Sequence, residues 1–219
     1  SGVTSQRAIM SIRKILLAAA AAVSMTFAFT GAAAAAAPAI SAKAADTRAA
    51  LRDLWTGHIF WVRNVVLAQL DKNAAQTNVA EAQVVANARQ IADSIAPFYG
   101  KQAADQLFEL LKGHYGPNRQ YLDAALANDA GAQEKAKQAL TSNAGAIAKI
   151  LSGANPNLPY DALNGMLLAH GGHHVSQIDQ LKSKAYADEA KTWTAMQGHM
   201  NHIADALASG IAKQFPEKF

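Results

Sequence analysis

Three histidines recur at equal intervals in a sequence whose apolar residues follow the periodicity of α-helices. His58, His114 and His170 lie 56 positions apart, and each ends a short apolar run, in the stretches LWTGH, LLKGH and MLLAH. The same offset relates Leu54 to Leu110, Gly57 to Gly113, Arg63 to Arg119, Asn87 to Asn143, Ile91 to Ile147 and Leu107 to Leu163. We therefore predict an internal duplication at this offset, in which a long histidine-bearing helix precedes a shorter helix. Two copies fill 48–159, and a third, altered helix pair follows them.

The periodicity indicates helix throughout the chain after residue 46. Apolar residues recur three and four positions apart, and the strong helix formers Ala, Leu, Gln, Lys and Glu are abundant, whereas no segment alternates as a half-buried strand does. We expect helices at 47–71, 79–96, 101–128, 132–151, 160–186 and 188–214, with breaks at Pro97, Gly100 and the stretch SGANPNLP. The predicted fold is all-α. Four long helices form an up-down bundle, and the shorter helices 79–96 and 132–151 lie over its sides or ends.

The N-terminal segment has the features of an export signal. Met10 is followed by two basic residues and an apolar run, in RKILLAAAAAVSMTFAFTG, and a small-residue cleavage pattern, AKA, ends at Ala44. The run is short and rich in alanine, which favours a cleaved signal over a permanent membrane anchor. We predict that residues 1–44 are a leader and signal peptide that is removed, with a cut within 32–37 as the alternative. Residues 45–219 then form one helical-bundle domain in the periplasm or outside the cell.

Charge and cysteine content exclude several functions. Four of the 20 basic residues and none of the 16 acidic residues lie within 1–44, so the remaining chain has no net charge. It also has no basic cluster, which argues against a nucleic-acid partner. The chain has no cysteine, and this excludes disulfides, thiolate metal sites, c-type haem attachment and a lipoprotein anchor.

The histidines are candidate metal ligands. Neutral imidazole is a common ligand for Zn, Cu, Ni and Fe. We expect one histidine from each of the four long helices, His58, His114, His170 and His199, to converge in the bundle core. His170 and His174 are one helical turn apart and share a face, and His199, which ends the similar stretch AMQGH, is three residues before His202. The candidate ligands are His58, His114, His170, His174, His199 and His202. The alternative is a hydrogen-bonded layer that only orders the core. Haem is disfavoured because nothing in the sequence specifies it.

Two arginines are candidates for binding an anionic ligand. Arg63 and Arg119 each follow a histidine by five residues, which places them roughly 140° around the helix from it. The alternative is an ordinary ion pair with Asp53, Glu109 or Asp205.

Asn118 and Tyr121 complete the candidate ligand-binding set, because helical spacing places them on the same face as His114. No serine-histidine-aspartate order, phosphate-binding loop or paired carboxylates can be identified. We therefore predict no catalytic residues, and a binding protein rather than an enzyme.

The order of the histidines resembles that of haemerythrin-like bundles, which carry a lone histidine, then HxxxE, HxxxH and HxxxxD on successive helices. The corresponding residues are His58, then His114 with Asn118, His170 with His174, and His199 with Asp205. The resemblance implies a metal centre between helices. Asn118 stands where those bundles have a bridging glutamate, and Asp205 is one residue out of register, so a di-iron centre is not implied.

The stretches LWTGHIFWVRNVVLAQL, ADSIAPFYG and SGIAKQFPEKF resemble a family of small exported bacterial helical-bundle proteins. This resemblance implies the fold and supplies no catalytic residues. The leading hypothesis is thus an exported helical bundle that binds a metal ion or small ligand through inward-facing histidines. The second is an exported structural or interaction protein, and the third is an oxygen-handling or redox protein.

Overall fold

Six α-helices make up most of residues 40–219, the range that the computed structural model describes, and no strand occurs within it. They are α2 (Ala42–Leu70), α3 (Ala74–Ser94), α4 (Ala96–Leu126), α5 (Ala130–Ala154), α6 (Tyr160–Lys182) and α7 (Tyr186–Gln214), followed by the short 3-10 helix η1 (Pro216–Lys218). The predicted all-α fold, with four longer and two shorter helices, is confirmed. The two shorter helices are α3 and α6, because α6 ends at Lys182 and does not continue to residue 186.

The predicted signal peptide lies outside the described residues, except for its last few positions. The described part begins at Ile40 and forms one compact unit. Ser41 caps α2, since its hydroxyl accepts a hydrogen bond from the backbone N–H of Ala44 at 3.1 Å. The predicted cleavage after Ala44 would therefore fall within the first turn of this helix. No helix of residues 40–219 is long and apolar enough to cross a membrane.

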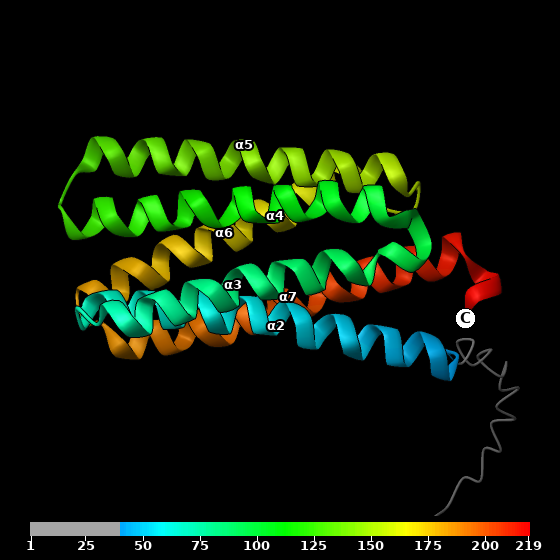
Figure 1. Cartoon of the computed structure of the whole chain (residues 1–219), viewed down its shortest axis with the longest axis horizontal. Coiled ribbons are helices and arrows are strands. Elements are labelled where there is room, and N and C mark those ends of the chain that lie inside the picture. The colour runs from blue at the N-terminus through cyan, green and yellow to red at the C-terminus, as the bar shows by residue number, and fades with distance from the viewer. Residues whose placement is uncertain (1–39) are drawn as a thin grey trace, which may run out of the picture. The chain divides into compact units, whose positions relative to one another are not determined.

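Three helical hairpins, α2–α3, α4–α5 and α6–α7, turn at the same end of the molecule (Figure 1). Each turn contains one residue in the left-handed region, namely Lys72 (φ 55°), Asn128 (φ 56°) and Lys184 (φ 61°). In each turn the next N–H donates back to a carbonyl five residues earlier: Asn73 to Ala68, Asp129 to Ala124 and Ala185 to Gln180, at 2.8–2.9 Å. This is the Schellman closure of a helix end. The three left-handed residues share the offset of the inner histidines.

The hairpins close into a ring. Besides the contacts within each hairpin, α3 packs on α4, α5 on α6, and α7 on α2. Helix α6 also contacts α2 and α4, so the first helix of each hairpin faces the interior. The two helices expected over the sides or ends of the bundle, α3 and α5, instead pack between other helices of this ring.

The core is built in layers from the three inner helices. Each layer takes one residue from each inner helix at the common offset: Leu51 with Leu107 and Leu163, Trp55 with Leu111 and Leu167, and Val66 with Leu122 and Ile178, all buried. The first two layers belong to a large apolar cluster at one side of the histidines, and the third belongs to a smaller cluster near the hairpin turns. These recurrences are what an internal repeat predicts. The histidines therefore lie between two apolar clusters that keep water away from them.

Gly100 interrupts helix α4 at a position where a helix break was predicted. Its φ of 84° and ψ of 168° separate a single turn, 96–99, from the long part of α4 that begins at Lys101. A side chain at this φ would be strained, whereas glycine adopts it freely. The break sets the direction in which the long part of α4 carries His114 into the ring.

Candidate metal centre

Four histidines from three inner helices converge in the core. His58 lies on α2, His114 on α4, and His170 and His174 on α6, and their exposed fractions are 7, 4, 1 and 1%. One ring nitrogen of each lies within 4.8 Å of the corresponding atoms of the other three. The Nε2 atoms of His58, His170 and His174 are closer still, at 3.2 Å (His58–His170), 3.3 Å (His58–His174) and 2.9 Å (His170–His174). The predicted convergence of His58, His114 and His170 is therefore confirmed.

These separations suit a single metal ion. A zinc–nitrogen bond is about 2.0–2.1 Å long, so two ligands of a tetrahedral ion lie about 3.3 Å apart. The three Nε2 separations of 2.9–3.3 Å are close to that value. His114 can add a fourth nitrogen, because its Nδ1 is hydrogen-bonded and its Nε2 has no partner among residues 40–219.

The histidines are held in the neutral form. Burial, with a smaller effect from His114, lowers the pKa of His58 to about 3. Burial likewise lowers the pKa of His114 to about 4, against a small opposing effect of its hydrogen bond to Asn143. The pKa values of His170 and His174 are well below the ordinary value, first through burial and then through the other histidines. Neutral imidazole is the form that binds metal, so the site is ready for an ion at pH 7.

Helix geometry explains why these side chains meet. His58 continues the buried stripe of Leu51 and Trp55, and His170 and His174 lie one turn apart on one face. The rings of His170 and His174 are in edge-on contact, with centroids 4.3 Å apart. The rings of His114 and His170 are stacked at 5.3 Å. The group is thus packed as a layer of rings rather than dispersed over a surface.

His199 and His202 are not part of this group. His199 donates from Nε2 to the carbonyl oxygen of Met166 at 2.7 Å, and His202 is exposed. At this level α7 fills the interior with Met196 and Met200, both fully buried. The expectation that α7 supplies a converging ring is therefore corrected. The fourth histidine is His174 of α6, and three helices surround the group, not four.

Arg63 is engaged in an ion pair one turn beyond the histidines. It donates from Nε and Nη2 to the two carboxylate oxygens of Glu189 on α7, at 2.7 and 3.0 Å. Glu189 is buried and also accepts a hydrogen bond from Gln177 at 2.8 Å. Asp205, one of the partners expected for the arginines, pairs instead with Arg52.

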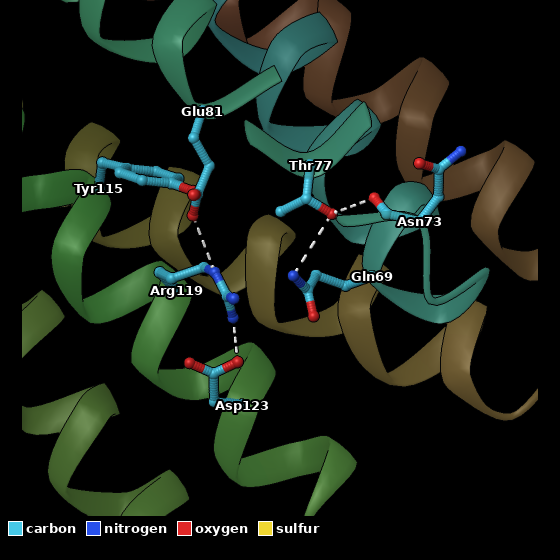
Figure 2. Close-up of polar contacts among 7 residues, drawn as sticks. All are labelled: Gln69, Asn73, Thr77, Glu81, Tyr115, Arg119 and Asp123. Atoms are coloured by element: carbon cyan, nitrogen blue, oxygen red, sulfur yellow. Dashed lines mark hydrogen bonds and ion pairs between the residues drawn. The ribbon is translucent and has the colours of Figure 1, made fainter. Parts of the chain in front are cut away.

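Arg119 is also engaged in ion pairs, at the interface of α3 and α4. It pairs with Asp123 and donates to Glu81 at 2.9 Å, and the hydroxyl of Tyr115 donates to the same carboxylate at 2.7 Å (Figure 2). A neighbouring set of contacts links Gln69 to Thr77 and Thr77 to the backbone of Asn73. The carboxylates expected to pair with the arginines, Asp53 and Glu109, take no part in these contacts.

The other two candidate ligand-binding residues, Asn118 and Tyr121, make contacts different from those of the arginines. Asn118 is buried one turn beyond His114, where His174 stands relative to His170. Its Oδ1 has no hydrogen-bond partner within the described range. The hydroxyl of Tyr121 donates to Asp179 at 3.0 Å, and burial raises the pKa of Tyr121 to about 12. Tyr121 thus joins α4 to α6 in its protonated form.

Sequence reasoning missed one group at the site. Asn143 of α5 accepts at Oδ1 from Nδ1 of His114, at 3.1 Å, and its Nδ2 donates to the carbonyl of Leu110 at 2.9 Å. The sequence signal was present, because Asn87 and Asn143 recur at the offset of the histidines, and Asn87 stands as far beyond His58 as Asn143 stands beyond His114.

A small cavity borders the group on its apolar side. Its volume is about 10 Å³, and the rings of His58, His114 and His170 form part of its wall together with Trp55, Leu111 and Leu167. A space of this size holds about one water molecule. A ligand bound in this cavity would therefore be about as small as water.

Comparisons of the chain with protein-family models, with curated proteins and with solved structures found no match. The resemblances drawn from the sequence therefore stay predictions.

Proposed function

We propose that this protein binds one transition-metal ion through His58, His114, His170 and His174. The mutual contact of three Nε2 atoms supports this function above all. A neutral imidazole Nε2 either carries a proton or presents a lone pair. Among three such atoms at 2.9–3.3 Å from one another, at least two must be of the same kind. Hydrogen bonds therefore cannot satisfy all three contacts, whereas one cation can accept all three lone pairs.

The donor set favours particular metals. The group consists of neutral nitrogen ligands, and no carboxylate from the described residues belongs to it. Such a set disfavours Mg²⁺ and Ca²⁺, which prefer oxygen, and suits Zn²⁺, Cu²⁺, Ni²⁺ and Fe²⁺. The near-tetrahedral spacing makes Zn²⁺ the first choice. A donor set of this kind, with no carboxylate from the described residues, also gives no support to a carboxylate-bridged di-iron centre of the haemerythrin kind.

The alternative role, a layer that only orders the core, makes a different prediction. A buried polar atom without a partner costs about 1–3 kcal/mol. The unpartnered Nε2 of His114 would add such a cost to any purely structural layer of the described residues. A bound ion removes it. The metal-binding proposal is therefore preferred.

Export remains part of the proposal. It is supported by the basic start and apolar run after Met10 and by the AKA pattern that ends at Ala44. A protein in the periplasm or outside the cell would meet the metal there. The intact mass of the secreted protein would test this, since retention of residues 10–44 would contradict it.

Thermal unfolding with and without metal tests the proposed function. Purified protein, first treated with a chelator, should bind one equivalent of Zn²⁺ and unfold at a higher temperature with it, because an ion bound only by the folded state stabilises it. Cu²⁺, Ni²⁺ and Fe²⁺ serve as competitors. His202→Ala is the matched control and should behave as wild type, since His202 is exposed. An unchanged melting temperature in wild type with every metal would leave the structural role as the better account.

A further inference from the structure

A second set of three residues recurs around the histidines. Asn87 follows His58, Asn143 follows His114 and His199 follows His170, each at the same spacing and each on the second helix of the same hairpin. All three hydrogen-bond a backbone carbonyl four residues before the histidine concerned. The bonds are Asn87 to Leu54 at 3.0 Å, Asn143 to Leu110 at 2.9 Å, and His199 to Met166 at 2.7 Å.

The hairpin of His114 shows what this anchor achieves. Because Nδ2 of Asn143 donates to Leu110, its Oδ1 is turned toward the ring of His114 and lies 3.1 Å from Nδ1. An oxygen there accepts a hydrogen bond from Nδ1–H, and this fixes the tautomer in which Nε2 presents its lone pair to the interior. The ring is thereby oriented as a ligand before any ion arrives.

The first hairpin has the same parts. Nδ2 of Asn87 donates to Leu54, which leaves Oδ1 as the free end of the amide. This oxygen is buried and has no partner in the described part of the chain. A Cβ at Gly57 would lie only 2.9 Å from Nδ2 of Asn87, so the glycine makes room for the amide beside His58.

The third hairpin has a histidine, His199, at the position of the two asparagines. His199 donates from Nε2 to Met166, so its Nδ1 is left as an acceptor. Nδ1 of His170 is buried and unpartnered among residues 40–219. The position equivalent to Gly57 and Gly113 is Ala169, and the residue opposite it is the longer histidine rather than an asparagine.

We infer that Asn87, Asn143 and His199 are the positioning residues of the metal centre, and that each accepts a hydrogen bond from Nδ1–H of one ligand histidine, His58, His114 and His170 respectively. The ligands' Nε2 lone pairs then point at one ion. The inference rests on the proposed function for its metal but concerns tautomers that exist without it. His174 has no such residue, because the position at the same spacing beyond it is the buried Ile203.

Nitrogen NMR of the histidine rings in the metal-free protein is the first test. We expect the Nδ1-protonated tautomer for His58, His114 and His170 in wild type. In Asn143→Ala the His114 ring should lose this preference, and in Asn143→Asp it should keep it. Asn64→Ala is the matched control, since the Asn64 amide likewise donates to a backbone carbonyl, that of Phe60 in its own helix at 2.9 Å, but this hydrogen bond is exposed. Nε2 protonation of His114 in wild type, or the same tautomer in Asn143→Ala, would overturn the inference.

Zinc affinity is the second test. Loss of a residue that orients a ligand typically weakens metal binding by about 10–100-fold. We expect this loss in Asn143→Ala and His199→Ala, rescue in Asn143→Asp, and wild-type affinity in Asn64→Ala. The double variant Ala169→Gly/His199→Asn recreates the first two hairpins and should bind within about 10-fold of wild type. Equal affinity of Asn143→Ala and wild type would refute the positioning role. Failure of wild type to bind Zn²⁺ would refute only the proposed function, because the tautomer test needs no metal.

Discussion

The first two hairpins and the third share a backbone plan but differ in chemistry at the site. All three have the same turn, the same inner histidine and a polar residue at the same spacing after it. The first two hairpins have Gly57 and Gly113 where the third has Ala169, and Asn87 and Asn143 where the third has His199. They have Val62 and Asn118 where the third has His174, and Arg63 and Arg119 where the third has Val175. The third hairpin therefore supplies two of the four histidines of the centre. The comparison teaches that recurring geometry sets where ligands stand, while local substitution sets how many there are.

The largest effect should come from removing the pair on the third hairpin. His170→Ala/His174→Ala leaves only two ligands, so we expect zinc binding to be lost. His114→Ala leaves the three close Nε2 atoms, and a three-histidine set still binds zinc. We expect that variant to bind more weakly by about 100-fold or more, since removing a ligand should exceed the loss from an orienting residue. Calorimetric titration with Zn²⁺ measures both. Equal residual affinity of the two variants would show that the third hairpin has no special share in the centre.

Acid should destabilise the metal-free protein steeply. The pKa is about 3 for His58 and about 4 for His114 in the folded state, and lower than ordinary for His170 and His174. Below the unfolded value of about 6.5 the unfolded chain takes up protons that the folded chain does not. The free energy of unfolding is therefore fully retained above about pH 6.5 and falls by about 1.4 kcal/mol per pH unit for each buried histidine as pH drops.

Urea unfolding between pH 7 and 5 checks this dependence, with His202→Ala as the control. His170→Ala/His174→Ala should reduce the dependence of the unfolding free energy on pH by twice as much as His58→Ala does. A histidine with an ordinary pKa would lose its metal below about pH 6. In the folded protein the ligands stay neutral further into acid, so metal loss should accompany unfolding. If the unfolding free energy of wild type depends on pH no more steeply than that of the double variant, the lowered pKa values are contradicted.

The two arginines that share the offset of the histidines should differ in importance. Arg63→Ala leaves Glu189, whose side chain is only 5% exposed, without its cation, and we expect a loss of about 2–3 kcal/mol of unfolding free energy. Arg119→Ala leaves Glu81 and Asp123 partly hydrated, at 31 and 57% exposed, so we expect about 1 kcal/mol or less. Chemical denaturation compares them. Adding Glu189→Gln should restore part of the stability of Arg63→Ala, and no restoration would argue against a stranded charge.

The smallest effects concern the residue before each inner histidine. Alanine favours helix over glycine by about 1 kcal/mol, so Ala169→Gly should destabilise by about that amount. Gly57→Ala must displace the Asn87 amide from 2.9 Å, and we expect a net loss of about 1 kcal/mol despite the better propensity. Gly113→Ala meets Asn143 at the looser 3.3 Å and should be nearly neutral. Thermal melts rank the three, and a stabilised Gly57→Ala would show that the amide is not confined.

Much of the fold could be predicted from local patterns. The spacing of apolar residues indicated the helices, and Gly100 and the stretch SGANPNLP marked real breaks. The end of α6 was missed because nothing in KSKAY resembles a glycine or proline break. Lys184 nevertheless adopts the left-handed conformation that ends the helix. Adding the offset between Lys72 and Asn128 to the position of Asn128 gives Lys184, and would have located the turn.

The candidate site could be predicted in part. The shared offset predicted that His58, His114 and His170 meet, and helical spacing placed His174 beside His170. His199 was grouped with them because it also follows a short run and a small residue. Its place in the repeat pattern is that of Asn87 and Asn143, on an outer helix whose inward face is filled by methionines. Identity of residue type was a weaker guide than position within the hairpin.

A crystal structure of the protein grown with Zn²⁺, with anomalous data at the zinc edge, tests the central claim most directly. We expect one ion among the inner helices, with Nε2 of His58, His114, His170 and His174 about 2.0–2.1 Å from it. The Nδ1 atoms of His58, His114 and His170 should face Asn87, Asn143 and His199. Zinc bound only at exposed residues such as His202, with no anomalous peak between α2, α4 and α6, would contradict the account.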